Sequence, residues 1–286
     1  MIARWLLCVL GFVFRCLPRR AANAVGAVLG YAWYYLIPIR RSVAIANLEL
    51  AFADKDKPER RKIARGCFVH LARCAVEFLR LGGLTVKKVT ALFDHVGWRH
   101  YEQAMEKGRG VIVVTAHFGN FDLLACAEAL SGVPLHIVTR EQHVGSINDY
   151  WMSQRAKFGL GLLPAKNSAF RILKLLRAKQ AVALVIDQHM PAGRGIAVPF
   201  FSRLASTTNA PAVLALSTGA PILPVTIERL SGGRHKVTID PEVEINRANE
   251  RLAEVERITT ELNLWLQDKI CKRPDQWLWI HRRWKL

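Results

Sequence analysis

Short apolar runs alternate with amphipathic stretches from Val111 to the end of the chain. Runs of about four to eight apolar residues predict buried strands, and apolar positions repeated at three- and four-residue spacing predict helices. The expected strands cover residues 111–115, 135–139, 160–164, 181–186, 222–230 and 236–240, and the expected helices cover 120–130, 146–158, 168–179, 208–217 and 250–272. Strands that alternate with helices in this way predict an α/β fold, with a mainly parallel sheet covered by helices on both faces.

A long helical pattern precedes the alternating region. Residues 47–84 show the periodicity of a helix, with Pro58 in the first turn of the segment 59–81 and the pair Gly82-Gly83 ending it. No internal repeat or low-complexity tract interrupts the chain, and 286 residues are enough for one sizeable α/β domain. We therefore expect residues 41–286 to form a single domain.

The first forty residues have a different character. Residues 5–14 form a short apolar run closed by arginines, and residues 21–39 form a longer run without charge. Arginines between the first run and the Ala-x-Ala pattern that follows disfavour a cleaved signal peptide. The aromatic group Trp33-Tyr34-Tyr35 suits a membrane interface. Residues 1–40 are therefore predicted to be a helical membrane anchor that spans the bilayer or lies shallowly in it, and the alternative is a helix packed on the domain.

The chain is strongly basic, because 41 Lys and Arg against 23 Asp and Glu give a net charge of +18. Such a charge favours nucleic acid, an anionic membrane or an acidic carrier protein as a partner. The sequence shows no zinc-finger, RNP or basic-zipper pattern, and its basic residues are spread along the chain, which argues against nucleic acid. The six cysteines form no C-x-x-C pair and no disulfide framework, as is typical of a reducing compartment.

One histidine closely follows the first buried strand of the alternating region. His117 lies in the loop after residues 111–115, and Asn120 is placed to cap the helix that begins at Phe121. Asp122 then falls in the first turn, where the helix dipole favours a carboxylate, and we expect it to reach back to His117. An imidazole held by a carboxylate acts as a general base towards an alcohol. Because no G-x-S-x-G nucleophile elbow occurs, the hydroxyl of the substrate is the expected nucleophile. The alternative is that His117 only caps a turn and Asp122 is an ordinary helix acid.

Further polar residues follow the ends of later strands. Arg140 comes after one predicted strand, and Asp187 and Gln188 come after another. Because parallel strands end at the same edge of a sheet, His117, Arg140 and Asp187 are expected to converge there. Arg140 would hold a phosphate or steady a developing oxyanion, whereas Asp187 with Gln188 would fix acceptor hydroxyls or orient Arg140. Taken singly, each of them also fits a surface arginine or a loop turn.

Two more residues complete the candidate site. Gly119 would let the backbone approach the acyl carbonyl closely, although simple turn geometry explains a glycine equally well. Arg155 lies on a predicted helix, where it contributes to the substrate site or belongs to a solvated face.

The segment His117-Phe-Gly-Asn-Phe-Asp122 resembles the H-x4-D/E motif of glycerolipid-type acyltransferases, in the H-x-G-N-x-E/D form of the bacterial lipid A biosynthesis (secondary) acyltransferases. Similar blocks occur in the family's order over nearly the whole chain: Asn47-Leu48, Thr139-Arg140, Arg155 with Gly159, Asp187-Gln188, Val198-Pro-Phe-Phe201, Thr218-Gly-Ala-Pro-Ile-Leu-Pro224 and Pro274-Asp-Gln-Trp-Leu-Trp-Ile-His-Arg-Arg-Trp284. The chain departs from the family at Asp122, where Glu is more frequent, at His189, where Asn is usual, and at Ser202, where Gly is usual. Related members that acylate mannolipids also use Asp, so these departures bear on the acceptor more than on the chemistry.

The resemblance implies an acyltransferase of this type. Its catalytic residues would be His117 and Asp122, and its substrate-binding residues would be Gly119, Asn120, Arg140, Arg155, Asp187 and Gln188. The implied partners are an acyl carrier protein thioester as donor, a glycolipid acceptor of the lipid A precursor type and membrane lipids, with no metal, cofactor or nucleic acid. The implied location is the cytoplasmic face of the bacterial inner membrane. The alternatives are a lysophospholipid or other glycolipid acyltransferase that uses acyl-CoA and, outside enzymes, a membrane-surface scaffold that binds anionic lipid.

Overall fold

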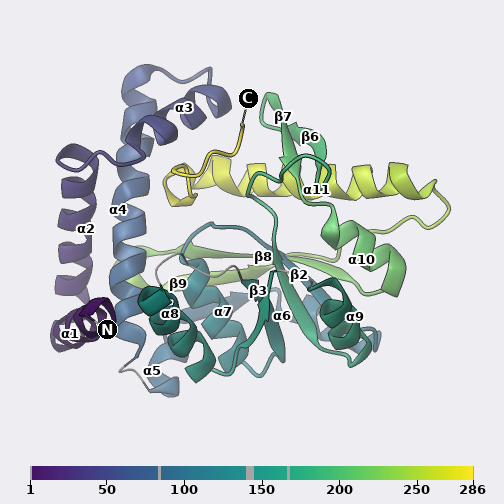
Figure 1. The fold of residues 1–286 in the computed structure, drawn as a ribbon, viewed down its shortest axis with the longest axis horizontal. Coiled ribbons are helices and arrows are strands. Elements are labelled where there is room, and N and C mark those ends of the chain that lie inside the picture. The colour runs from purple at the N-terminus through teal and green to yellow at the C-terminus, as the bar shows by residue number, and fades with distance from the viewer. Residues whose placement is uncertain (1, 83–84, 140–144, 166–167, 286) are drawn as a thin grey trace.

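A seven-stranded sheet lies at the centre of the computed structural model, which describes residues 2–82, 85–139, 145–165 and 168–285 (Figure 1). The strand order is β1-β9-β8-β2-β5-β3-β4, and all neighbours pair in parallel except β8 and β9. The strands are β1 (Phe93–Val96), β2 (Val111–Thr115), β3 (Leu135–Thr139), β4 (Gly161–Pro164), β5 (Ala181–Val185), β8 (Ile222–Arg229) and β9 (His235–Ile239). The predicted mainly parallel sheet is confirmed.

Helices cover both faces of the sheet. They are α4 (Lys57–Leu81), α5 (Val86–Thr90), α6 (Trp98–Glu106), α7 (Phe121–Leu130), α8 (Gly145–Lys157), α9 (Ala169–Arg177), α10 (Ala210–Thr218) and α11 (Arg251–Lys272). One core cluster joins residues of α4, α7 and α8 to Val113 of β2, and a second joins residues of α9, α10 and α11 to Ile112 of the same strand. Because β2 is buried on both faces, its sequence is a continuous apolar run rather than an alternating one.

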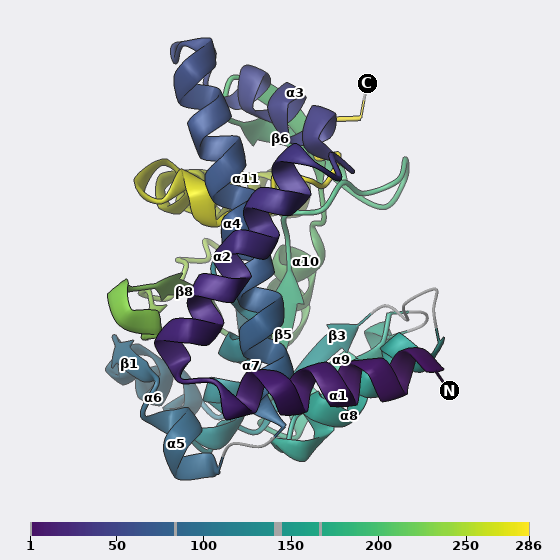
Figure 2. The ribbon, with the colours of Figure 1, turned by 90° about the vertical axis from the view of Figure 1, so that its left-hand side faces the viewer.

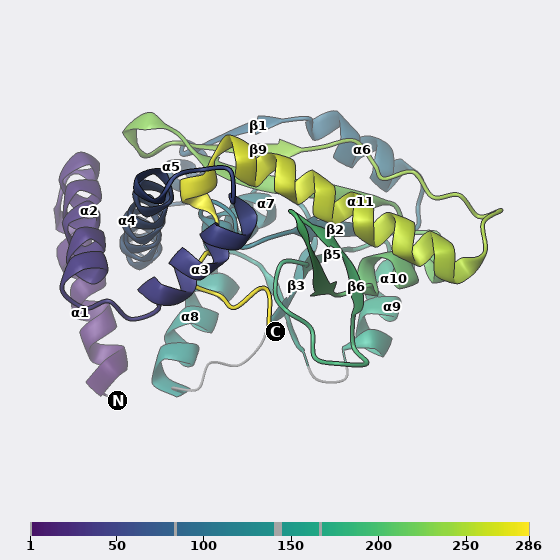
Figure 3. The same ribbon diagram turned by 90° about the horizontal axis from the view of Figure 1, so that it is seen from above.

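A small hairpin and the C-terminal segment pack on the same side as α11. β6 (Ile196–Phe200) and β7 (Arg203–Thr207) pair with each other in antiparallel fashion and lie against α11 (Figure 3). After α11 the chain makes the short turn η2 (Pro274–Gln276), and the following Trp277 and Trp279 are almost fully buried with Phe200.

The first two helices pack against α4. α1 (Ile2–Cys16) crosses the end of α4 and meets α8, while α2 (Arg19–Tyr35) runs along α4 (Figure 2). At Gly30 a Cβ atom would lie only 2.4 Å from the Cα of Val69, so the helices approach this closely only with glycine. The outward faces stay uncovered, since Trp5 of α1 and Val28 of α2 are each 65% exposed. The predicted anchor therefore has a side packed on the domain and a side open to its surroundings.

No helix within the described residues is both long and apolar enough to cross a bilayer.

The chain before β2 contains more elements than the sequence analysis predicts. The pattern over residues 47–84 divides into α3 (Arg41–Ala51) and α4, because the capping box of Asp56 and Glu59 starts a new helix. β1 was missed because it is a half-exposed strand of 4 residues without a clear apolar period. α5, α6, β6 and β7 were also missed, and each of them is short or largely exposed.

Candidate active site

The loop between β2 and α7 places His117 at the carboxyl edge of the sheet. Asn120 caps α7 by accepting a backbone N–H of its first turn, as predicted. Gly119 has a φ of +61° and lies so close to β8 that a Cβ atom would stand 1.7 Å from the carbonyl oxygen of Ile227. Glycine is therefore required at position 119, because the backbone that follows His117 passes too close to β8 for any side chain.

Asp187 holds the ring of His117. The Nδ1 atom of His117 lies 2.8 Å from one carboxylate oxygen of Asp187, and the His117 backbone N–H donates to the other at 3.0 Å. The indole N–H of Trp277 also donates to Asp187, at 2.8 Å. Thr115 and Val185 are paired at the ends of β2 and β5, so the two chains leave the sheet side by side and bring these groups together. The predicted convergence of His117 and Asp187 is confirmed.

This contact sets the chemical form of His117. With the Nδ1 proton donated to the carboxylate, Nε2 carries the free lone pair, and the side-chain nitrogen of Gln188 lies 3.4 Å from it. Burial opposes protonation of His117, but the charge and hydrogen bond of Asp187 outweigh it and raise the pKa of the imidazole. Burial likewise opposes ionisation of Asp187, yet the interaction with His117 lowers the pKa of that carboxyl. The pair is thus a carboxylate-oriented base with its free nitrogen beside Gln188.

Asp122 has different partners from the one predicted. Its carboxylate accepts hydrogen bonds from the guanidinium of Arg155 and, at 3.1 Å, from the indole of Trp151. Both members of the ion pair are largely buried, with side chains 9% and 13% exposed. The expected hydrogen bond from Asp122 to His117 is therefore replaced, among the described residues, by the one from Asp187. The reason is directional: Asp122, in the first turn of α7, faces α8, which carries Trp151 and Arg155.

The remaining predicted residues lie in several places. Gln188 is beside the free nitrogen of His117, whereas the amide of Asn120 donates to Glu77 at 2.8 Å. The Gly119 N–H donates to the backbone oxygen of Gln276 at 2.9 Å. Arg140 lies outside the described residues.

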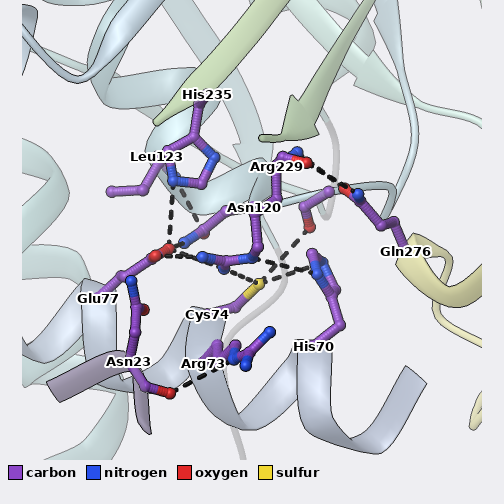
Figure 4. Close-up of polar contacts among 11 residues, drawn as sticks. Asn23, His70, Arg73, Cys74, Glu77, Asn120, Leu123, Arg229, His235 and Gln276 are labelled. Carbon is purple, nitrogen blue, oxygen red and sulfur yellow. Dashed lines mark hydrogen bonds and ion pairs between the residues drawn. The ribbon is translucent and has the colours of Figure 1, made fainter. Parts of the chain in front are cut away.

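A buried network of charged and polar side chains contacts the loop between β2 and α7 (Figure 4). The carboxylate of Glu77, on α4, accepts from Asn120 and from two nitrogens of Arg229, the last residue of β8. Arg229 also donates to Cys74, whose thiol in turn contacts the backbone oxygen of Gly119 at 3.8 Å. Burial disfavours ionisation of Glu77, but Arg229 outweighs it and lowers the pKa of the carboxyl to about 2. The network is therefore charged, and it ties the His117 loop to α4 and β8.

Sequence reasoning did not find Glu77 or Arg229. Both occur in stretches whose pattern indicates only a helix and a strand. A signal was present, because Glu77 is a carboxylate among the apolar residues of α4 that fill the core, and an inward charge of that kind needs a buried partner. Trp277 was not predicted as a site residue either, because its hydrogen bond to Asp187 depends on a contact across 90 residues.

Within the described residues, no group of three His, Cys, Asp or Glu side chains is arranged to hold a metal ion.

An imidazole oriented by a carboxylate, at the edge of an α/β sheet, is an arrangement suited to taking a proton from a nucleophile. Similarity to known proteins identifies the chain as an acyltransferase. Residues 1–286 match the family described as bacterial lipid A biosynthesis acyltransferase. The chain belongs to that family, as its motifs indicated.

Relatives of known activity cover most of the chain. It is 29% identical over 272 residues to the lipid A biosynthesis palmitoleoyltransferase of Escherichia coli, covering 94% of this chain and 86% of the relative. It is 22% identical over 274 residues to the lipid A biosynthesis lauroyltransferase of the same organism, with coverage of 94% and 87%. It is also similar to the phosphatidylinositol mannoside acyltransferase of Mycolicibacterium smegmatis, at 23% identity over 226 residues, with coverage of 78% and 72%. The relatives are thus named for different glycolipids.

Proposed function

We propose that this protein transfers a fatty acyl chain from an acyl carrier protein thioester to a hydroxyl of a glycolipid acceptor of the lipid A precursor type. The observation that carries the proposal is the contact between His117 and Asp187, which leaves Nε2 of His117 free to accept a proton. The family membership supports the acyl chemistry, and the relatives named for lipid A support the acceptor class.

The reaction follows from this geometry. Nε2 of His117 takes the proton of the acceptor hydroxyl, and the resulting oxygen attacks the thioester carbonyl. Asp187 holds the ring in the reactive tautomer and stabilises the imidazolium that forms. Collapse of the tetrahedral intermediate expels the thiolate, which receives the proton from His117. No acyl-enzyme is formed. In this scheme Asp122 supports the site through Arg155 rather than through the imidazole.

Membrane association is part of the proposal. The outward faces of α1 and α2 present exposed apolar side chains, including Trp5, Phe12 and Val28, to the surroundings. A helix with one apolar face binds in the plane of a membrane interface, and the net charge of +18 favours an anionic leaflet. We place the enzyme on the cytoplasmic face of the bacterial inner membrane, where residues 1–40 act as its anchor.

The decisive experiment is His117→Ala, assayed with a purified glycolipid acceptor and an acyl carrier protein thioester. Loss of a positioned base is expected to slow turnover by roughly 10²–10⁴-fold. The variant is expected to remain folded by circular dichroism, and His100→Ala, a histidine change on α6, serves as the control with near-normal turnover. Near-normal turnover by a well-folded His117→Ala protein would exclude the mechanism.

The same assay distinguishes the donors. If an acidic carrier protein docks on this basic enzyme, its apparent affinity is expected to fall steeply as ionic strength rises, and acyl-CoA is expected to be the poorer donor. If acyl-CoA equals or exceeds the carrier protein thioester, the acyl-CoA-dependent alternative is favoured instead.

A further inference from the structure

A cavity of about 580 Å³ lies between α2, α4 and η2, apart from the catalytic residues. Figure 2 shows α2 running along α4, with the end of α11, from which η2 continues, beside them. The lining includes neither His117 nor Asp187. Its charged residues are predominantly basic: Lys55, Lys62, Arg65, Arg73 and Arg229 against Glu59 and Asp275.

Most of these cations are not neutralised by carboxylates. Arg229 is paired with Glu77, but the other four basic residues form no ion pair with a carboxylate among the described residues. Of the two acids, Glu59 is occupied in part by the capping box at the start of α4. Arg65 and Arg73 are half-buried, which reduces their hydration and strengthens their attraction for an anion. The cavity therefore carries a surplus of positive charge that an anionic group would balance.

The rim of the cavity is apolar on the α2 side. Tyr31 lines the cavity and is 46% exposed. Val28 and Tyr35 lie three residues before and four after it, hence on the same face of α2, and are 65% and 54% exposed. The hydroxyl of Tyr35 accepts a hydrogen bond from Arg65 at 3.1 Å, so the apolar strip and the basic wall adjoin each other. Basic residues next to an exposed apolar strip are suited to binding a molecule with an anionic headgroup and hydrocarbon chains.

We propose that this cavity binds the phosphate-bearing headgroup of an anionic phospholipid, at a site separate from the catalytic centre. The phosphate lies between Arg65 and Arg73, which can each donate two hydrogen bonds to its oxygens. The acyl chains lie along Val28, Tyr31 and Tyr35 of α2 and continue into the bilayer. This inference rests on the membrane association in the proposed function, and it assigns one specific lipid contact to it.

The test uses the full chain and two double variants with the same loss of charge. Arg65→Gln with Arg73→Gln changes the cavity, and Arg171→Gln with Arg177→Gln changes exposed arginines of α9, away from α2 in Figure 1. Flotation is measured with vesicles of phosphatidylcholine alone and of phosphatidylcholine mixed with phosphatidylglycerol. The cavity variant is expected to bind the phosphatidylglycerol vesicles at least about tenfold more weakly than the unaltered protein, and the control within about twofold of it. Equal losses in both variants would indicate diffuse charge attraction and overturn the proposal.

A second measurement identifies the source of the phosphate. Water-soluble dihexanoylphosphatidylglycerol and inorganic phosphate are titrated against the protein by calorimetry. The short-chain lipid is expected to bind at least about tenfold more tightly, because only it contacts the apolar strip of α2. Equal affinities would assign the cavity to free phosphate and overturn the lipid assignment. If the double variant is unfolded by circular dichroism, Arg65→Gln alone replaces it, with an expected loss of about threefold or more.

Acyl transfer to detergent-dispersed acceptor separates this proposal from the proposed function. Neither double variant is expected to change kcat or KM in detergent, because no residue of the catalytic pair is altered. Retained transfer with lost phosphatidylglycerol binding supports both proposals. A raised KM for the glycolipid in the cavity variant would assign the cavity to the acceptor and overturn the proposal of a separate site, while leaving the enzyme assignment intact.

Discussion

The imidazole of His117 takes its orientation from a carboxylate 70 residues further along the chain. Asp187 accepts hydrogen bonds from three donors, which are the ring and backbone of His117 and the indole of Trp277. A carboxylate that accepts several hydrogen bonds stays ionised even when it is buried. Its negative charge is therefore available to stabilise an imidazolium during the transfer of a proton.

Replacing Asp187 by Asn tests this role through the pH dependence of the reaction. If neutral His117 is the base, as proposed, activity is expected to appear as the pH rises through the pKa of the imidazole, which Asp187 raises. Asp187→Asn removes that charge and is expected to move the acid limb of kcat/KM to lower pH, with turnover lower by roughly 10²–10⁴-fold. Asp187→Glu, which restores the charge, is expected to recover part of the rate. An acid limb that does not move in Asp187→Asn would contradict the assignment.

The ion pair of Asp122 and Arg155 is expected to contribute to stability. Asp122→Asn leaves the guanidinium of Arg155 buried without a counter-charge, which costs about 3–5 kcal/mol. The double variant Asp122→Asn with Arg155→Gln is expected to lose less free energy of unfolding than the two single variants together. Asp122→Glu, which keeps the charge, is expected to retain activity. Urea unfolding of the unaltered protein, Asp122→Asn, Arg155→Gln and the double variant gives the coupling energy of the pair. A coupling near zero would show that the pair is not a stabilising unit.

At the scale of elements, the loop that carries His117 is held by elements other than the strand and helix that it joins. α4 supplies Glu77, β8 supplies Arg229, and η2 supplies the carbonyl that accepts the N–H of Gly119. Figure 4 shows Glu77, Arg229 and Gln276 gathered around Asn120 of this loop. A shift of α4 or β8 is therefore expected to move His117 as well, because Gly119 already lies in the closest possible contact with β8.

Glu77→Gln and Glu228→Gln compare a buried with an exposed ion pair on neighbouring elements. Glu77 faces Arg229 inside the core, whereas Glu228 pairs with Lys236 and Arg273 near the surface. Loss of the Glu77 charge is expected to cost about 3–5 kcal/mol and to speed amide exchange in the loop that carries His117. Loss of the Glu228 charge is expected to cost less than about 1 kcal/mol. Similar costs for both, measured by urea unfolding, would argue against the network.

The elements that sequence patterns predicted are those with the strongest burial. β2 and β3 were predicted at their observed boundaries, and the helix that follows β2 begins at the predicted residue. β1 was not predicted because it is short and partly exposed, so its sequence shows only a weak hydrophobic pattern. In the site, His117 was found because a polar residue after a buried strand is conspicuous. Its partner was misassigned to Asp122 because sequence spacing reports which residues are near in the chain, not which way a helical side chain faces.

At the scale of the whole molecule, two kinds of surface coexist. The chain carries a net charge of +18, and the outward sides of α1 and α2 are apolar. Since α2 also packs against α4, removal of residues 1–40 would uncover a face of α4 as well as remove the outward side. Substitutions confined to exposed residues therefore separate membrane binding from folding more cleanly than a deletion does.

Trp5→Ser with Phe12→Ser is expected to weaken binding to anionic vesicles while the fold is retained. The two side chains are 65% and 61% exposed, so their loss removes little internal packing. Each aromatic group that enters a membrane contributes roughly 1.5–3 kcal/mol, which corresponds to about tenfold or more in partitioning. Phe170→Ser, a change at a residue 76% exposed on α9, is the matched control. Unchanged flotation of the α1 variant would contradict the anchor.

The bond from Trp277 to Asp187 imposes an order on the assembly of the active site during translation. Phe118 also forms an isolated β-bridge with Trp277, so both sides of the catalytic pair depend on the segment after α11. A ribosome that has completed the sheet through β9 has made His117, Asp187 and most of the core, but not the residue that orients the carboxylate. We therefore expect the growing chain to form most of its sheet before Trp277 docks on Asp187, and activity, if it depends on this pair, to appear only after that step.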